Sequence, residues 1–224
     1  MTGVQTCALP IFNANLGEII KILSGLYPDA KTGLEYGNNF QLLIAVILSA
    51  QCTDMQVNKI TGKLFNKYRL PEDYARLNVD TLANEIKSCG LFYNKSKNII
   101  NTCRMLVEEY GSCVPSTREE LEKLPGVGPK TASVLLGIAF NQHTIPVDTH
   151  VFRVSHRLGL SKAKTPERTE KELLALLPPQ YRMDFHHQLL SHGRQVCTAR
   201  KPKCTDCQLL KYCATGNSFF TGES

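Results

Sequence analysis

Four cysteines near the end of the chain restrict the local fold more than any other feature of this sequence. Cys197, Cys204, Cys207 and Cys213 form a C-x6-C-x2-C-x5-C array. Four thiolates this close in a chain can enclose one metal centre, and their spacing alone fits either zinc or an iron–sulfur cluster. A basic stretch, residues 199–203, lies between the first two cysteines. The array therefore predicts a metal site that holds a cationic loop.

Composition sets broad limits on the class of protein. A chain of 224 residues suits one large or two small domains, and a hydrophobic content of 42% is enough for a real core. The net charge of +6 only weakly indicates a nucleic-acid partner. The longest apolar run, residues 42–48, is far shorter than the ~20 residues of a membrane span, so no membrane association is expected.

Nine cysteines in a chain of this length point to a particular compartment. The first residues lack the basic and long apolar regions of a secretory signal. We therefore expect a reducing environment, in which clustered cysteines bind metal in preference to forming disulfides. The predicted location is cytoplasmic, in association with the nucleoid if the source is bacterial.

The first eleven residues are excluded from the fold. The string MTGVQTCALPI, residues 1–11, resembles the translation of a common sequencing-adapter oligonucleotide. An ordinary disordered N-terminus is the alternative. At the other end, residues 214–224 are expected to form a tail after the last cysteine.

Apolar residues recur at helical spacing along almost the whole chain. The pattern predicts an all-α fold of many short helices, because no alternation of strands and helices is present. The predicted helical segments are 16–26, 40–50, 53–67, 82–88, an apolar stripe over 99–110, a short helix that begins with a capping box at 116–119, 129–140, a helix from about 148, another from 165, and 181–193.

The segment Leu-Pro-Gly-Val-Gly-Pro-Lys, residues 124–130, separates two predicted helices. Its glycines, Gly126 and Gly128, permit a tight turn and leave backbone N–H groups around Val127 without side-chain cover. Those donors precede a helix N-terminus, where the dipole favours an anion. The segment therefore predicts a sequence-independent contact to a DNA phosphate. A plain turn between helices is the alternative.

With LPGVGPKTA, the strings SAQCTD (49–54), VDTHVFRV (147–154) and the cysteine array resemble the endonuclease III family of DNA glycosylases. The resemblance covers about residues 13–213. It implies a helix–hairpin–helix fold with a DNA cleft between two helical domains. One would be a six-helix barrel of residues 32–142, with the hairpin motif at about 117–140. The other would join residues 12–31 to 143–213 and hold the metal centre.

The resemblance implies that Lys130 is a nucleophile and Asp148 its carboxylate partner. Lys130 follows the hairpin in the first turn of a predicted helix, where the positive end of the dipole disfavours an ammonium. Asp148 lies at the predicted start of another helix, where a carboxylate is favoured. By themselves, such residues are more often a solvated lysine and an N-cap. In the family frame they predict a bifunctional DNA glycosylase and AP lyase that cleaves the abasic strand by β-elimination.

Further site residues follow from the same resemblance. Gln51 would fill the gap that an extruded nucleotide leaves, and Leu91 would wedge into the base stack; the alternatives are a surface glutamine and a core leucine. Arg200, Lys201 and Lys203 would reach phosphates. The four cysteines would bind a [4Fe–4S] cluster without taking part in catalysis. Residues that would support the site are Asp54, Glu122 and His150.

The expected partner is double-stranded DNA with damaged bases, oxidised pyrimidines above all, or with abasic sites, bound by a monomer. One alternative is a monofunctional adenine glycosylase of the same superfamily, but such enzymes lack the lysine and usually carry a further C-terminal domain. Here Lys130 is present and the chain ends soon after Cys213. Another alternative is a non-enzymatic DNA-binding module, which the pairing of Lys130 with Asp148 disfavours. A zinc-stabilised interaction protein is a more distant possibility.

Overall fold

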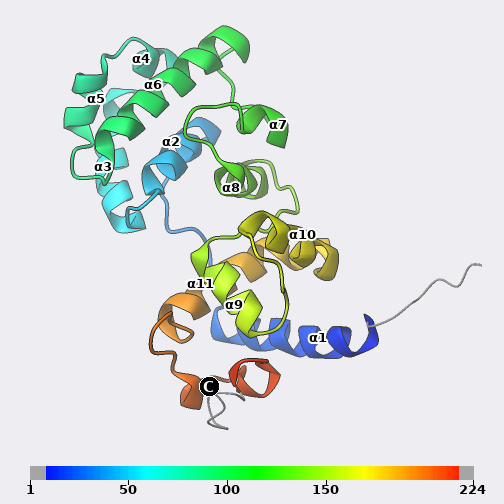
Figure 1. Cartoon of the computed structure of the whole chain (residues 1–224). Helices are drawn as coiled ribbons and strands as arrows, with labels where there is room; N and C mark the ends of the chain where they lie inside the picture. Colours follow the sequence, from blue (N-terminus) through cyan, green and yellow to red (C-terminus); the bar gives the residue numbers. More distant parts are fainter. Residues whose placement is uncertain (1–8, 217–224) are drawn as a thin grey trace, which may run out of the picture. The chain divides into compact units, whose positions relative to one another are not determined.

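The structure is a computed structural model that describes residues 9–216 (Figure 1). Within this range the regular elements are all helices, which confirms the all-α fold class. The described part of the chain divides into two compact units: residues 32–146 form a continuous unit, and residues 9–31 join residues 147–216 in the other. The sequence predicts the second boundary between the units after residue 142, whereas in the structure it falls after residue 146. The discontinuous unit brings the N-terminal helix together with the cysteine array.

The continuous unit contains seven helices, shown in blue to green in Figure 1. The helix α2 is apolar all round, and its residues 42–48 are all buried, so it serves as the centre of this unit. Helices α3, α6 and α8 pack against α2, while α4 and α5 pack on α6 and α7 packs on α8. The bounds are α2 Asn39–Ser49, α3 Asp54–Lys67, α4 Pro71–Ala75, α5 Val79–Glu85, α6 Phe92–Glu109, α7 Arg118–Leu121 and α8 Pro129–Ala139.

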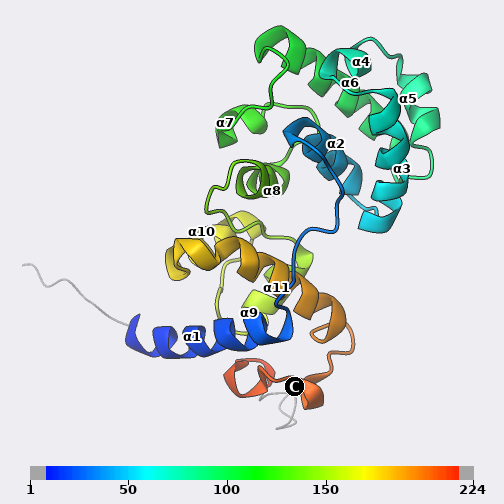
Figure 2. The ribbon, with the colours of Figure 1, turned by 180° about the vertical axis from the view of Figure 1, so that it is seen from behind.

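The discontinuous unit is built on α11, against which α1 and α9 pack, and α10 packs on α9. Figure 2 shows α1 and α11 side by side from behind. After α11 the chain continues through two single 3-10 turns that separate the last three cysteines. The bounds are α1 Leu9–Leu26, α9 Thr149–Arg157, α10 Pro166–Leu176 and α11 Arg182–Gln195, with 3-10 turns at Pro179–Tyr181, Cys204–Asp206 and Leu210–Tyr212.

Several helix starts match the sequence-based expectation because their caps are local. Thr53 begins α3 by accepting a hydrogen bond from the backbone N–H of Gln56 at 3.3 Å. Thr165 does the same for α10. Each threonine hydroxyl oxygen accepts a hydrogen bond from a first-turn backbone N–H, which has no carbonyl acceptor within the helix. These starts could therefore be located from the sequence.

Three expectations need correction. The N-cap of α7 is Thr117 and not Ser116: the Thr117 hydroxyl accepts from the Glu120 backbone N–H and donates to the Glu120 carboxylate at 2.6 Å. Val107, assigned to the apolar stripe of α6, is 37% exposed. The short helix α4 was not anticipated, although Pro71 occupies its first turn, where proline is favoured.

The proposed adapter segment, residues 1–11, falls largely outside the described residues, which begin at Leu9 in α1. Of the expected tail, residues 217–224 also lie outside them. Among the helices that the structure does describe, none is long and apolar enough to cross a bilayer.

We predict that the stability of the continuous unit depends strongly on α2. Leu43 is fully buried in its core, so Leu43→Ala should lower the free energy of unfolding by about 2–5 kcal/mol through lost burial and a residual cavity. Val107→Ala is the matched control on exposed α6 surface and should change it by less than about 0.5 kcal/mol. Urea unfolding followed by circular dichroism measures both. Equal losses for the two variants would show that α2 is not the core helix.

Candidate functional site

The segment between α7 and α8 folds into a tight hairpin. The Val127 N–H donates to the Leu124 carbonyl at 3.0 Å, and Gly126 between them has a left-handed φ of +84°. A Cβ at Gly126 would also lie 3.1 Å from the Asn98 side chain of α6. Glycine is therefore required at position 126 by the fold itself.

Gly128 is a glycine for a different reason. It is the N-cap of α8 with φ −96° and ψ 179°, an extended conformation that any residue adopts, and a Cβ there would meet nothing within 4 Å. No side chain caps α8, so the first free N–H groups of the helix have no side-chain acceptor. The open space beside them is available to an external anion. Lys130, in the same first turn, is exposed and makes no hydrogen bond or ion pair within this unit.

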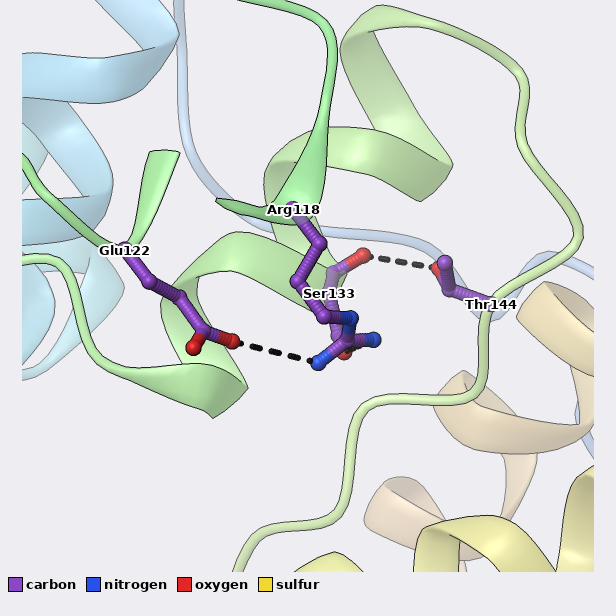
Figure 3. Close-up of polar contacts among 4 residues, drawn as sticks. All are labelled: Arg118, Glu122, Ser133 and Thr144. Carbon is purple, nitrogen blue, oxygen red and sulfur yellow. Dashed lines mark hydrogen bonds and ion pairs between the residues drawn. The ribbon is translucent and has the colours of Figure 1, made fainter. Parts of the chain in front are cut away.

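Side-chain hydrogen bonds fix two segments to α8: the helix α7 before it and the loop after it, which contains Thr144 (Figure 3). Arg118 of α7 donates to the Ser133 hydroxyl at 2.6 Å and pairs with Glu122 at 3.5 Å. Thr144 donates to the Ser133 carbonyl at 2.7 Å. On the other side of the hairpin, Thr102 of α6 donates to the Pro125 carbonyl at 2.7 Å. Thr102 thus bonds the hairpin directly, while the bonds of Arg118 and Thr144 fix α8 after it, and Glu122 pairs with Arg118.

Asp148 is the N-cap of α9 in the discontinuous unit. Its Oδ1 accepts the backbone N–H groups of His150 and Val151, both at 2.8 Å. Both bonds use the same carboxylate oxygen, so Oδ2 is left without a hydrogen bond to its own helix. His150 is half-buried, and its Nδ1 lies 3.1 Å from the Arg153 guanidinium one turn further on.

Gln51 and Leu91 lie on two segments that contact each other in the continuous unit. Both residues have left-handed backbone conformations, with φ +54° and φ +57°. Both are exposed, Leu91 by 55%. A Cβ at Gly90 would stand 3.2 Å from the Gln51 carbonyl, so these two turns pack closely. Non-glycine residues in this conformation are uncommon and cluster at ligand-binding positions. Asp54, in the first turn of α3, lies beside Gly33 and not in this pair of turns.

The four cysteines of the array line one cavity, together with residues from α9, α11 and the final turns. Within residues 9–216 no three His, Cys, Asp or Glu side chains converge closely enough to hold a single metal ion. The four cysteine thiols supply the four ligands that an iron–sulfur cluster of this type needs. The donor set therefore fits the expected [4Fe–4S] group.

Two basic side chains of α9 anchor the backbone around this cavity. Arg157 donates to the Thr198 carbonyl at 2.7 Å and to the Ala199 carbonyl at 3.0 Å, and its guanidinium lies 3.4 Å from the Cys197 sulfur. Arg153 donates to the Cys197 carbonyl at 3.0 Å. These charge-assisted bonds fix the start of the array to a rigid helix.

His192 of α11 lies behind the array. Its Nε2 is 3.6 Å from the Cys207 sulfur, and its Nδ1 is 3.2 Å from the Tyr27 hydroxyl of α1. Burial lowers the pKa of His192 to about 4, so the imidazole is neutral at physiological pH. A neutral ring presents one donor and one acceptor, which suits a thiolate on one side and a hydroxyl on the other.

The basic loop after Cys197 is closed by short-range bonds. The Lys203 N–H donates to the Val196 carbonyl at 3.0 Å, and the Thr198 hydroxyl donates to the Lys201 carbonyl at 2.7 Å. The side chains of Arg200, Lys201 and Lys203 are exposed. The loop therefore presents its cations to solvent from a fixed backbone.

The structure brings some sequence-predicted residues together within each unit. The hairpin glycines share one turn with Lys130, the segments of Gln51 and Leu91 pack together, and the four cysteines share one cavity. Lys130 and Asp148 belong to different units. Sequence reasoning missed the anchoring residues Arg118, Arg153, Arg157 and His192, and the buried Lys95. Of these five residues, Lys95 alone could have been found from the sequence: it precedes Ile99 by one helical turn, so the helical pattern places it on the buried stripe of α6.

Two family models match the chain. Residues 44–179 match the HhH-GPD superfamily base excision DNA repair protein model, which spans the hairpin and Asp148. Residues 197–213, the cysteine array, match the iron–sulfur binding domain of endonuclease III.

Individual proteins and solved structures that are similar to this chain point to the same family as the two family models. Endonuclease III of Rickettsia felis is 48% identical over 91% of this chain and 95% of its own length, and that of Escherichia coli (strain K12) is 45% identical over 88% and 93%. Two solved structures, a non-covalent endonuclease III–DNA complex and a trapped endonuclease III–DNA covalent intermediate, are each 42% identical, with a TM-score of 0.88 over 93% of this chain and 98% of theirs.

The fold and its site thus define a helix–hairpin–helix base excision DNA repair protein. More particularly, the chain belongs to the endonuclease III family, whose members are DNA glycosylases with AP-lyase activity and a [4Fe–4S] cluster.

We predict that Arg157 protects the metal centre. Arg157→Ala removes the donors to the Thr198 and Ala199 carbonyls, so the backbone around Cys197 should loosen. The variant should lose its visible iron–sulfur absorbance about fivefold faster in air than the wild-type protein, an estimate from the loss of about 1 kcal/mol of local hydrogen bonding. Arg168→Ala, an exposed arginine of α10, is the control and should match the wild type. An unchanged rate in Arg157→Ala would contradict the anchoring role.

Proposed function

We propose that this chain removes oxidised pyrimidines from double-stranded DNA and then cleaves the abasic strand, with Lys130 as nucleophile and Asp148 as its carboxylate partner. The observation that carries the proposal is the first turn of α8. There Gly128 leaves backbone donors open beside an exposed lysine that has no partner within its unit. Such a turn can hold a phosphate and present an amine to the neighbouring sugar.

The hairpin supplies the binding step. A DNA phosphate oxygen at the N-terminus of α8 would accept the N–H groups that lack a side-chain cap. The contact carries no base information, so it positions the duplex and does not select the lesion. The cations of Arg200, Lys201 and Lys203 add further phosphate contacts from the basic loop.

The chemistry begins once the damaged nucleotide is extruded from the duplex. The Lys130 amine, in its neutral form, attacks C1′ of the sugar while the bond from C1′ to the base breaks, and the base leaves with the bonding electrons and takes a proton from the new C1′-bound ammonium. The bond between C1′ and the ring oxygen O4′ then breaks, O4′ takes a proton from solvent, and a protonated Schiff base between Lys130 and C1′ results. The Schiff base acidifies the C2′ protons, and removal of one expels the 3′ phosphate by β-elimination.

Asp148 suits electrostatic support of this reaction. Its Oδ1 is occupied by two backbone donors at the start of α9, which fixes the carboxylate in place. The other oxygen can face the positive charge that develops on the sugar as the base departs. Arg153, one turn further on, bonds the Cys197 carbonyl and so holds the same helix against the array, and His150 contacts the Arg153 guanidinium.

Extrusion leaves a gap in the stack, which Gln51 and Leu91 would fill from their two exposed turns. The four cysteines would hold the [4Fe–4S] cluster, whose contribution is to order the basic loop and not to supply redox chemistry. We further propose that the protein acts as a monomer on chromosomal DNA in the bacterial cytoplasm.

The two hairpin glycines provide the first test. Gly126→Ala should lower the free energy of unfolding by about 1–2 kcal/mol, because alanine is strained in the left-handed region. Gly128→Ala should cost less than about 1 kcal/mol but weaken duplex binding about tenfold, since a methyl group would exclude the phosphate from charged hydrogen bonds. Fluorescence anisotropy with an undamaged duplex measures affinity. Undiminished binding by Gly128→Ala would refute a phosphate at this turn.

The nucleophile has a separate test. Lys130→Gln keeps a polar side chain of similar length but has no basic nitrogen, so cleavage of a duplex with a preformed abasic site should fall by at least about a thousandfold. Denaturing gels read the β-elimination product. Lys123→Gln, which changes an exposed lysine in the turn after α7, is the control and should cleave within about twofold of wild type. Full strand cleavage by Lys130→Gln would rule out Lys130 as the nucleophile.

A further inference from the structure

Lys95 of α6 has an unusual environment for a lysine. Its side chain is only 4% exposed. Its Nζ donates to the Leu48 carbonyl at 2.8 Å and to the Ala50 carbonyl at 2.6 Å, and it lies 3.0 Å from the Cys89 sulfur. No carboxylate is among these partners. A buried lysine is rarely retained without a specific task, because removing its charge from water is costly.

Hydrogen-bond counting shows how the site is satisfied. The Cys89 thiol donates its own hydrogen to the Leu48 carbonyl at 3.2 Å, so its sulfur is free to accept from Lys95. An ammonium has three donors, and three acceptors surround it. Leu48 and Ala50 stand at the C-terminal end of α2, where unpaired carbonyls and the helix dipole carry partial negative charge. The end of α2 thus takes the place of a counter-ion.

The three acceptors lie close to the two turns whose residues Gln51 and Leu91 were proposed above to fill the gap in the stack: Leu48 ends the buried part of α2, three residues before Gln51. Ala50 directly precedes Gln51, and Cys89 lies two residues before Leu91. Lys95 itself stands in the first turn of the helix that Leu91 begins. One buried side chain therefore joins both segments.

Both turns need such support. Gln51 and Leu91 each hold a left-handed backbone conformation, which is strained for a residue with a side chain. A further contact links the turns: the close approach of Gly90 to the Gln51 carbonyl. Among the residues that the structure describes, only Lys95 reaches the main chain at the end of α2 with a basic side chain, and charged hydrogen bonds are about twice as strong as neutral ones.

We infer that Lys95 is a positioning residue for nucleotide extrusion: its buried ammonium locks the Gln51 and Leu91 turns in the geometry that replaces the flipped nucleotide. This inference rests on the proposed function of those two residues. Lys95 touches neither DNA nor the reacting atoms. Its effect should therefore fall on extrusion and base excision, and should spare the cleavage of a site that already lacks its base.

Lys95→Met tests this role, because methionine keeps the length and volume of the side chain but has no donor. At saturating DNA, excision of thymine glycol should slow about tenfold, while cleavage of a preformed abasic site should stay within about twofold of wild type. The fluorescence rise of 2-aminopurine placed beside the lesion, which reports unstacking, should be lost in parallel. Lys97→Met, an exposed lysine of the same helix, is the matched control and should retain the signal.

A double-mutant cycle separates positioning from general destabilisation. If Lys95 acts through the two turns, Lys95→Met should add less than about twofold to the excision defect of a Gln51→Ala and Leu91→Ala double variant. A fully additive tenfold loss, or an unchanged 2-aminopurine signal in Lys95→Met, would overturn the inference. A wild-type protein inactive on both substrates would instead refute the proposed function.

A second variant and measurements of folding separate the positioning role of Lys95 from a role in stability alone. Lys95→Gln keeps a shorter donor group and should recover part of the 2-aminopurine signal that Lys95→Met loses. Thermal unfolding and iron content should stay close to wild type in at least one of the two variants. Failure of both to fold would assign Lys95 to stability alone and would overturn the positioning role.

Discussion

The arrangement of the proposed site depends on how one helix begins. The N-cap of α8 is a glycine, so no side chain satisfies the free N–H groups of the first turn, and the lysine of that turn faces solvent. Unsatisfied donors at a helix end are costly unless water or a ligand bonds them, and a phosphate satisfies them well. Hydrogen bonds from Arg118, Thr102 and Thr144 hold the hairpin and α8 beside this opening. The open donors are therefore confined to one place on a rigid frame.

A second theme is that buried or half-buried cations are paired with backbone carbonyls. Arg157 and Arg153 bond carbonyls next to the cysteine array, and Lys95 bonds those at the end of α2. A carbonyl at a helix end carries partial negative charge but contributes no full charge. These cations therefore order the loops and still contribute to the net charge of +6, which favours a polyanionic partner.

Much of the fold was predictable because its signals are local. Thr53 and Thr165 begin helices with caps that depend only on the next three residues. Residues 42–48 are all apolar, and this composition predicts a buried helix. The start of α7 was predicted one residue too early because Ser116 and Thr117 can both accept a capping hydrogen bond, and the N-cap in the structure is Thr117. The four cysteine ligands could be predicted from their close spacing in the sequence. The choice of a cluster over zinc needed the family resemblance, and the cavity around the four thiols agrees with it.

The residues that sequence reasoning missed act at long range. Arg157 meets Thr198 and Lys95 meets Leu48 across more than 40 positions, and the sequence contains no record of those contacts. A lysine on an apolar stripe is the one pattern that indicates burial, and Lys95 fits it.

The most direct test of the central claim is to locate the covalent bond between protein and sugar. The wild-type protein is incubated with an abasic duplex and borohydride, digested with protease, and the modified peptide is sequenced by mass spectrometry. We predict that the reduced sugar adduct lies on Lys130. An adduct on a different amine, or no adduct from protein that carries its iron–sulfur cluster, would contradict the proposed nucleophile.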